Sequence, residues 1–239
     1  MMNKAAAAKA IDLDAVNAAL EGGRPEDVLR WGLEQYAGRI ALASSFGAED
    51  LVLIDMLASL ERPFRVFYLD TDLLFAETYA LIERVRSRYG IVPERYSPRL
   101  TLAAQAAEKG AALWARQPDQ CCAIRKVEPL GRALAGLDAW MTGIRRDQTP
   151  QRANARLVDW DGAHRLVKLN PIAAWTAEQV WAYIRANDVP FNPLHEQGYP
   201  SIGCTPCTRP VRRGEDPRAG RWAGFQKTEC GLHVAEPAG

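Results

Sequence analysis

Short apolar runs that alternate with helical stretches constrain the fold of this 239-residue chain more than any other feature. Residues 39–43 and 64–69 are brief and apolar, as buried strands are. Residues 48–60 and 74–89 follow them with helical spacing, and the second of these segments is closed by Gly90, a residue typical of helix ends. Strand and helix alternating at such short intervals predict an α/β fold, in which a parallel sheet is covered by helices on both faces.

The two ends of the chain differ from this pattern. Residues 12–37 predict two short helices. Residues 139–142 predict another short strand, and Thr176 with Gln179 predicts a capped helix that runs to about Asn187. Residues 190–239 are rich in Pro, Gly and Arg and show little apolar periodicity, which predicts a tail built from loops. We therefore expect N-terminal helices (1–37), an α/β domain (38–200) and a C-terminal tail (201–239).

The bulk composition narrows the classes of partner. The formal net charge is +1, so no overall attraction to nucleic acid or to an anionic membrane surface is expected. No apolar run reaches the roughly 18 residues of a membrane span, and the N-terminus lacks the apolar stretch and cleavage site of a secretory signal. We expect a cytoplasmic protein without a nucleic-acid or membrane partner, and a homo-oligomer is compatible with the sequence.

A loop of small residues, 44–47, separates the first predicted strand from its helix. Backbone N–H groups in such a loop can face an anion at the helix N-terminus. Asp70-Thr71 ends the next predicted strand, so both loops are expected to flank one crevice beyond the carboxyl ends of the strands. In the alternative interpretation, this serine loop only connects the strand to the helix and binds no ligand.

The distribution of the five cysteines is uneven, since none occurs in the first 120 residues. An odd number without a signal peptide makes a disulfide framework a poor interpretation. Cys204 and Cys207 form a C-x-x-C, a spacing that lets two thiolates reach one metal centre, and the tandem pair Cys121-Cys122 adds two more. Adjacent residues rarely point the same way on regular structure, so a tandem pair on one centre requires a special local backbone. Zinc, a four-iron cluster and unmetallated thiols all remain open at this point.

Basic residues follow both cysteine pairs, and they would offset the negative charge of a four-thiolate centre. They are Arg125 and Lys126 after the first pair and Arg209, Arg212 and Arg213 after the second.

Cys230 stands alone near the C-terminus. A cysteine nucleophile needs cationic help, because a free thiol is mostly protonated at neutral pH. Lys227 and His233 lie close in sequence, and Arg218 and Arg221 lie on the same tail. Cys230 is therefore a candidate nucleophile, with an incidental exposed thiol as the alternative.

Together these features make the chain resemble the assimilatory adenylyl-sulfate reductases, which are relatives of the 3′-phosphoadenylyl-sulfate reductases. The resemblance extends over most of the chain. Its specific part is the combination of tandem cysteines, a distant C-x-x-C and a terminal Glu-Cys-Gly-Leu-His, whereas the serine loop alone is not specific. The matching stretches are residues 44–50, 69–71, 121–130, 143–148, 204–207 and 229–233.

The resemblance implies an adenine-nucleotide α-hydrolase-like fold, with a doubly wound, mostly parallel sheet and an irregular C-terminal tail. It implies a [4Fe–4S] cluster whose ligands are Cys121, Cys122, Cys204 and Cys207. Lys126 is expected near both cluster and substrate sulfate, and Cys230 is the expected nucleophile on a mobile tail. The residues that the resemblance implies for substrate binding are Ser44, Ser45, Phe46, Gly47, Asp70, Thr71, Lys126, Gly143, Arg152, Arg218, Arg221 and His233. Among them, Arg152, Arg218 and Arg221 are expected to contact the nucleotide's anionic groups.

The activity implied is reduction of adenylyl sulfate to sulfite and AMP, in sulfate assimilation and cysteine biosynthesis. The implied route passes through an S-sulfocysteine on Cys230, with thioredoxin (or glutaredoxin) as reductant. Three alternatives remain: a 3′-phosphoadenylyl-sulfate reductase, a zinc-stabilised nucleotide-binding protein, and an ATP-pyrophosphatase-like ligase. The sequence departs from the family pattern at Asp72, where a glycine is common, and at Phe75-Ala76, where His-Pro is common.

Overall fold

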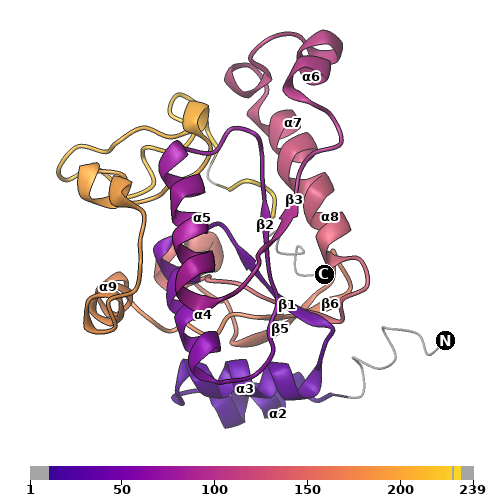
Figure 1. Cartoon of the computed structure of the whole chain (residues 1–239), viewed down its shortest axis with the longest axis vertical. Helices are drawn as coiled ribbons and strands as arrows, with labels where there is room; N and C mark the ends of the chain where they lie inside the picture. Colours follow the sequence, from indigo (N-terminus) through magenta and orange to yellow (C-terminus); the bar gives the residue numbers. More distant parts are fainter. Residues whose placement is uncertain (1–10, 228, 233–239) are drawn as a thin grey trace.

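The computed structural model describes residues 11–227 and 229–232, and a six-stranded sheet forms its centre (Figure 1). The strand order is β3-β2-β1-β4-β6-β5. All neighbouring strands are parallel except β5 and β6, which form an antiparallel pair at one edge. The strands are β1 (Ile40–Ser44), β2 (Val66–Leu69), β3 (Glu94–Tyr96), β4 (Ala139–Met141), β5 (Val158–Asp161) and β6 (Leu166–Leu169).

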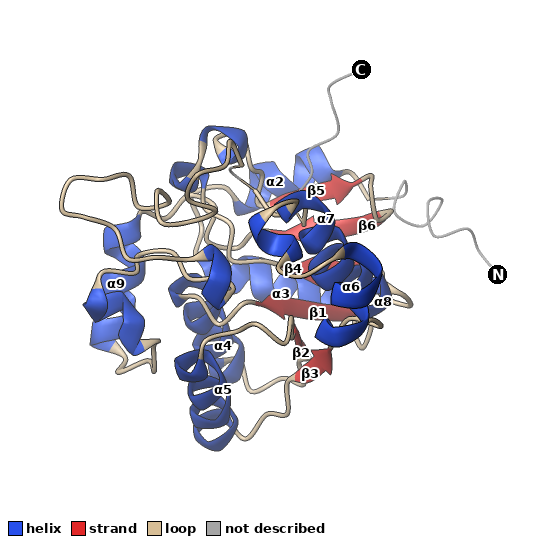
Figure 2. Cartoon of the chain, turned by 90° about the horizontal axis from the view of Figure 1, so that it is seen from above, coloured by secondary structure: helices blue, strands red, loops and turns tan. Residues whose placement is uncertain are grey.

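Helices cover both faces of the sheet, as the alternating pattern predicts. Figure 2 shows α4 and α5 on one side and α8 on the other. The longer helices of the described chain are α2 (Leu13–Leu20), α3 (Pro25–Gln35), α4 (Ala48–Ser59), α5 (Ala76–Tyr89), α6 (Leu102–Lys109), α7 (Pro118–Cys122), α8 (Glu128–Leu134) and α9 (Ala177–Ala186).

Two hydrophobic cores follow from the side-chain alternation of the strands. Ile40 and Leu42 of β1 point into the larger core, which also contains the buried faces of α3, α4, α5 and α9. Ala41, between them, points into the smaller core against α8. Successive residues of a strand face opposite sides, so a strand buried on both sides reads as a continuous apolar run. The doubly wound, mostly parallel fold is therefore confirmed.

The site lies where the strand order reverses. β2 and β4 flank β1 on opposite sides, so the loops after these strands diverge and leave a crevice at the carboxyl edge of the sheet. The loop after β1 contains residues 45–47, the loop after β2 contains residues 70–75, and the loop after β4 contains residues 142–145. These are the segments in which the sequence places candidate binding residues.

Several elements differ from the sequence prediction. The strands β3, β5 and β6 have no counterpart in it; β3 consists of Glu94, Arg95 and Tyr96, none of them buried, so it lacks an apolar signal. Helix α5 begins at Ala76, two residues later than predicted. Gly90 closes α5 with φ 63°, the left-handed conformation expected of a helix-ending glycine. In the described chain, no helix is long and apolar enough to cross a membrane.

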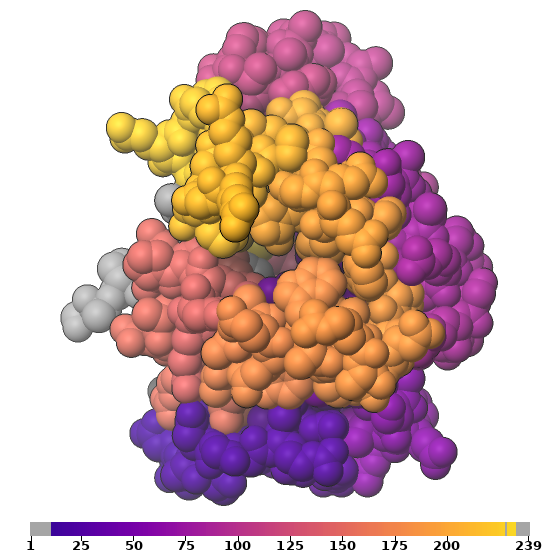
Figure 3. All heavy atoms as spheres, turned by 90° about the vertical axis from the view of Figure 1, so that its left-hand side faces the viewer, coloured from indigo at the N-terminus to yellow at the C-terminus, as the bar shows by residue number. Residues whose placement is uncertain are grey.

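The chain after α9 crosses the carboxyl edge of the sheet. Up to residue 232, its described residues form short turns and no regular strand; two of these turns are η5 (Pro193–Gln197) and η6 (Thr205–Cys207). Isolated bridges join Leu74 to Cys204 and Thr208 to Arg221, which fix the tail to the loop after β2 and to itself. In Figure 3, the orange and yellow residues of this region surround a hollow on one face of the molecule.

Candidate active site

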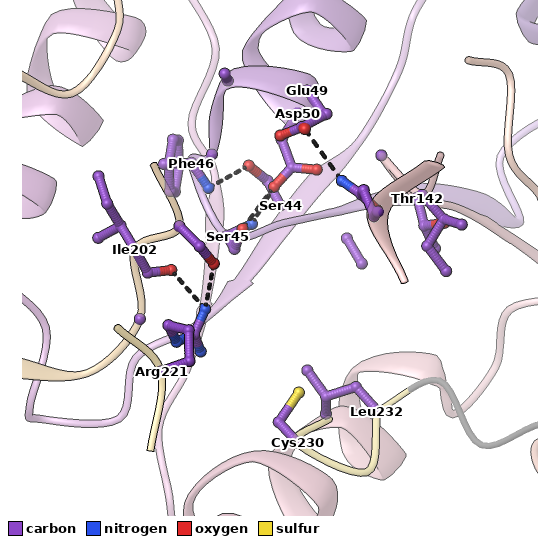
Figure 4. A pocket seen from close by; sticks show the side chains of 18 of the residues that line it. Ser44, Ser45, Phe46, Glu49, Asp50, Thr142, Ile202, Arg221, Cys230 and Leu232 are labelled. Carbon is purple, nitrogen blue, oxygen red and sulfur yellow. Dashed lines mark hydrogen bonds between the residues drawn. The ribbon is translucent and has the colours of Figure 1, made fainter. Parts of the chain in front are cut away.

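A cavity of about 500 Å³ opens at the carboxyl edge of the sheet, between the strand loops and the tail (Figure 4). Its wall combines the loops after β1, β2 and β4 with the tail on the opposite side. Of the residues expected to bind substrate, these line it: Ser44, Ser45, Phe46, Gly47, Thr71, Lys126, Gly143, Arg152, Arg218 and Arg221. Cys230 lines it too, whereas His233 lies outside the described residues.

The serine loop is held rigidly by its own hydrogen bonds. Phe46 adopts a left-handed φ of 56°, and its N–H donates to Ser44 Oγ over 3.0 Å. Ser45 donates twice to Asp50 Oδ2, from its backbone N–H over 2.6 Å and from its hydroxyl over 2.8 Å. Burial raises the pKa of Asp50 to about 6, although the two bonds from Ser45 oppose the shift. Asp50 thus fixes the loop that precedes its own helix, α4.

Gly143 packs directly on the N-terminus of α4. A Cβ atom there would lie 2.5 Å from Asp50 Oδ1 and 2.8 Å from Glu49 Cβ, distances that real Cβ atoms do not show. Arg145, two residues later and buried, donates to Glu49 Oε1 over 3.1 Å. The loop after β4 is therefore packed against the serine loop's helix because residue 143 has no side chain.

The two residues that end β2 have different positions. Thr71 lines the cavity, and its Oγ1 lies 3.3 Å from Cys204 Sγ. Asp70 does not line the cavity: it is 1% exposed and accepts hydrogen bonds from Tyr79 Oη at 2.7 Å and from Arg95 Nε at 2.6 Å. Asp70 therefore stabilises the turn after β2, and its expected role in substrate binding stays a prediction.

Asp72 takes the backbone conformation that a glycine would take at this turn. Its φ is 55°, a left-handed value that aspartate tolerates better than most residues. Its carboxylate accepts from Arg125 Nη2 over 2.6 Å, while Arg125 Nε donates to the carbonyl of Thr71. The departure from the family pattern is thus compensated by an arginine from the helical segment of the tandem cysteines.

Three arginines face the cavity from two sides. Arg152 Nη2 donates to Glu229 Oε2 over 2.7 Å, and Arg218 Nη2 lies 3.6 Å from the same oxygen. Arg221 donates to Ser201 Oγ over 3.0 Å and to the carbonyl of Ile202, as Figure 4 shows for the latter. Burial lowers the pKa of Arg218, and Arg221 and Arg152 lower it further against the opposing effect of Glu229. The cluster is therefore a concentrated, partly dehydrated positive charge suited to an anion.

Cys230 is half-buried and lies across the cavity from the serine loop, with its sulfur directed inward (Figure 4). Lys126 lines this cavity and also the adjoining pocket of cysteines. Lys227 instead pairs with Asp119 and lies 5.3 Å from the centre of the Trp222 ring. The ammonium group of Lys227 is therefore directed toward α7.

The four other cysteines share one small pocket behind the cavity. Its lining consists of Cys121, Cys122, Cys204 and Cys207 with Leu73, Pro118, Arg125, Lys126 and Trp222. Cys121 and Cys122 end α7, and the chain continues in a π-helical turn, η2 (Ala123–Val127). The tandem pair itself lies on regular helical backbone, since Cys122 has φ −64° and ψ −38°, so the special local backbone expected at the pair is not found there; the π turn begins at the next residue.

The chemistry of this pocket fits a metal centre of soft ligands. All four cysteines are free, and burial, with the neighbouring cysteines, raises the pKa of Cys121 and of Cys207 to about 11. Thiolate ligands select zinc or iron–sulfur centres, and the charge of a bound metal stabilises the ionised form. Within residues 11–227 and 229–232, no three acidic, histidine or cysteine side chains are arranged around a single metal-ion position.

The basic residues after the second cysteine pair are not part of this pocket. Arg209 pairs with Glu215 at 3.0 Å, and Arg212 and Arg213 are mostly exposed. Only Arg125 and Lys126, of the five basic residues considered, line the pocket. The prediction that all five offset the charge of a cysteine centre is therefore wrong for the three tail arginines.

Gln148 and Glu229 line the cavity, and the sequence analysis did not name either as a site residue. Gln148 donates to Glu49 Oε1 over 3.0 Å and accepts from Arg152 Nη1 over 2.6 Å, which links the serine loop's helix to the arginine cluster. Glu229 pairs with Arg152. Both residues lie inside stretches that carry the family resemblance, and this was the available signal.

The fold and the site together define a doubly wound α/β protein with a pocket of four cysteines next to its cavity. The model of the phosphoadenosine phosphosulfate reductase domain matches residues 39–210. The chain therefore belongs to the phosphoadenosine phosphosulfate reductase family and is an enzyme.

Two sequences and two solved structures are similar to this chain over most of its length. The adenosine 5′-phosphosulfate reductase of Shouchella clausii is 47% identical over 95% of this chain and 94% of its own. The adenosine 5′-phosphosulfate reductase 1 of Bacillus subtilis is 49% identical over 86% and 89%. The crystal structure of phosphoadenylyl-sulfate reductase from Candida auris matches with a TM-score of 0.74 and 31% identity, over 82% of this chain and 95% of that one. Candida glabrata FMN adenylyltransferase, at 15% identity and a TM-score of 0.58 over 81% and 66%, shares the fold.

Proposed function

We propose that this enzyme reduces adenylyl sulfate to sulfite and AMP in sulfate assimilation, with Cys230 as the nucleophile. The observation that carries the proposal is that one cavity contains Cys230, the serine loop and the arginine cluster. The relatives named adenosine 5′-phosphosulfate reductase support the unphosphorylated nucleotide as substrate, since they are 47% and 49% identical to this chain. The phosphoadenylyl-sulfate reductase is 31% identical.

In this proposal the anionic end of the nucleotide lies between the serine loop and the arginines. Backbone N–H groups at the start of α4 favour an anion, as the N-terminus of a helix does. Arg152 Nη1 donates to Gln148 Oε1 over 2.6 Å, which holds this guanidinium at the cavity wall before substrate arrives. Lys126, which reaches the same cavity, offsets the charge of the sulfate group.

The first chemical step is a displacement at sulfur. The Cys230 thiolate attacks the sulfur of adenylyl sulfate, a sulfur–sulfur bond forms, and the sulfur–oxygen bond to the phosphate breaks. AMP leaves with that electron pair, and Cys230 becomes an S-sulfocysteine. Because nucleophile and substrate are both anionic, the fixed cations of the cavity lower the barrier by reducing their repulsion.

The second step needs an external dithiol. A thioredoxin (or glutaredoxin) thiolate attacks Cys230 Sγ, sulfite leaves with the bonding electrons, and a mixed disulfide remains. The second thiol of the dithiol then releases Cys230 and completes a disulfide on the partner. Both electrons come from the dithiol, and a cytoplasmic location, where thiols are kept reduced, belongs to the same proposal.

The pocket of Cys121, Cys122, Cys204 and Cys207 would hold a [4Fe–4S] cluster. When bound, this group would supply structural cohesion and a fixed local charge beside the cavity. Lys126 lies between the two sites, so its charge acts on both. Cys204 Sγ also lies within hydrogen-bond distance of the Thr71 hydroxyl, and this contact links the pocket to the loop after β2.

The test is the intact mass of anaerobically purified protein mixed with adenylyl sulfate and no reductant, with the 3′-phosphorylated nucleotide run in parallel. We expect a gain of one sulfonate on Cys230, mainly with the unphosphorylated nucleotide. The same gain with only the phosphorylated nucleotide would make the protein a 3′-phosphoadenylyl-sulfate reductase. No adduct with either nucleotide, from protein with intact iron and sulfide, would refute the proposed route.

A further inference from the structure

The carboxylate of Glu229, the residue before Cys230, lies in the arginine cluster of the cavity. Its Oε2 is 2.7 Å from Arg152 Nη2 and 3.6 Å from Arg218 Nη2. The hydroxyl of Thr149 lies 3.4 Å from the other carboxylate oxygen. The side chains of Glu229 and Arg152 are 19% and 13% exposed, so solvent screens this ion pair only weakly.

The surroundings of this carboxylate are those of a bound oxyanion. Two guanidinium groups and a hydroxyl face its two oxygens from the cavity wall. Guanidinium donors serve carboxylate, sulfate and phosphate oxygens alike, because all three present paired acceptors at similar spacing. Burial lowers the pKa of Arg218, which is the behaviour of a cation in a site that needs an anion.

We propose that Glu229 occupies the anion position between Arg152 and Arg218 when substrate is absent, and that the substrate's sulfate or phosphate group competes with it. A single carboxylate oxygen faces both arginines, so an incoming oxyanion reaches the same donors only by displacing it. Glu229 is thus a positioning residue that docks the tail. The inference rests on the proposed function in assigning the substrate's anionic group to these arginines.

Displacement of Glu229 moves the nucleophile, because Glu229 and Cys230 are consecutive and adjacent Cα atoms lie about 3.8 Å apart. Gly231 follows with φ 81°, a conformation that glycine adopts without strain and that lets the chain pivot beside Cys230. The competition therefore couples the arrival of substrate to the placement of Cys230.

The variant Glu229→Gln tests the competition, since it keeps the size of the side chain and removes its charge. The probes are inorganic sulfate and AMP, titrated calorimetrically into anaerobic protein with intact iron and sulfide. We expect the variant to bind both about tenfold more tightly, because a charged competitor for the same donors is gone. Glu229→Asp, which keeps the charge on a shorter side chain, should fall between the two proteins.

A second measurement follows the tail itself. Without ligand, Cys230 of Glu229→Gln should react severalfold faster with iodoacetamide than in the parent protein, as mapped by peptide mass, because the tail is no longer docked. Glu215→Gln is the matched control: it lies on the same tail and pairs with Arg209 at 3.0 Å. It should change neither the binding nor the alkylation rate.

Unchanged or weaker binding of sulfate and AMP by Glu229→Gln would overturn the inference, as would an unchanged alkylation rate. These results are distinct from failure of the proposed function. If the parent protein formed the Cys230 adduct while Glu229→Gln bound sulfate no better, the function would stand and the competition would be refuted. If no adduct formed but the variant bound sulfate more tightly, the competition would stand and the proposed function would be refuted.

Discussion

Arg125 Nη2 lies 2.6 Å from Asp72 Oδ2, and the Arg125 side chain is 1% exposed. This ion pair joins the loop after β2, where Thr71 faces the cavity, to the segment that follows the tandem cysteines. Arg125 also donates to the carbonyl of Thr71 and to Gln105 Oε1. The nucleotide side of the site and the cysteine pocket are therefore mechanically one unit.

Asp72→Ala should destabilise the protein by about 2 kcal/mol, because it leaves the buried Arg125 guanidinium without its carboxylate. The measurement is urea-induced unfolding together with the rate at which iron is lost. Asp188→Ala is the control, since Asp188 also has a left-handed φ, of 50°, but pairs with Arg88 on the surface. Equal losses for the two variants would show that backbone strain, and not the ion pair, explains the effect.

Gly143→Ala should cost about 1–3 kcal/mol of stability, because its Cβ would meet Asp50 Oδ1 at 2.5 Å. The α4 N-terminus would shift, so binding of AMP should weaken as well. Gly131→Ala in α8 is the contrasting change: among the described residues nothing lies within 4 Å of its Cβ, and it should stabilise by about 0.5–1 kcal/mol. The measurements are thermal unfolding and AMP titration of both variants. An AMP affinity unaffected by Gly143→Ala would contradict the expected shift of the α4 N-terminus.

The buried carboxyl of Asp50 should make stability fall as pH rises from about 4 to about 6. Burial raises the pKa of Asp50 to about 6 in the folded protein, so between these pH values the folded state binds more protons than the unfolded state. Asp50→Asn should remove this dependence. The difference between the urea midpoints of the two proteins should change by the equivalent of roughly 2 kcal/mol across this range and stay constant above it. A difference that does not vary with pH would refute the assignment.

Cys230→Ser should abolish formation of the sulfonate adduct, because a serine hydroxyl is a far weaker nucleophile than a thiolate. The variant should retain the iron, sulfide and absorbance of the parent protein, since Cys230 does not line the cysteine pocket. Cys207→Ser, in that pocket, should show the complementary defect and lose iron. Turnover by Cys230→Ser at the normal rate would exclude the proposed nucleophile.

The sequence by itself determined the main strands and helices, because these depend on patterns within a few neighbouring residues. Apolar runs such as 39–43 predict buried strands, and helical spacing predicts α4 and α9 nearly to the residue, because burial on both faces and capping are encoded within a few neighbouring positions. The cysteine pattern predicted a special backbone at the tandem pair, but Cys121 and Cys122 end the regular helix α7 and the π turn η2 only follows them. Strand β3 escaped prediction because its three residues are stabilised by pairing with β2 and carry no apolar signal of their own.

Only the tertiary structure decided which charges meet. Residues 152 and 229 lie far apart in sequence, and nothing local to either predicts their ion pair. The same holds for Asp70, whose carboxylate accepts hydrogen bonds from Arg95 and Tyr79 and does not line the cavity. Side-chain pairing depends on where the folded backbone brings distant segments together and on the cost of leaving a buried charge alone, and neither quantity can be read from one stretch of sequence.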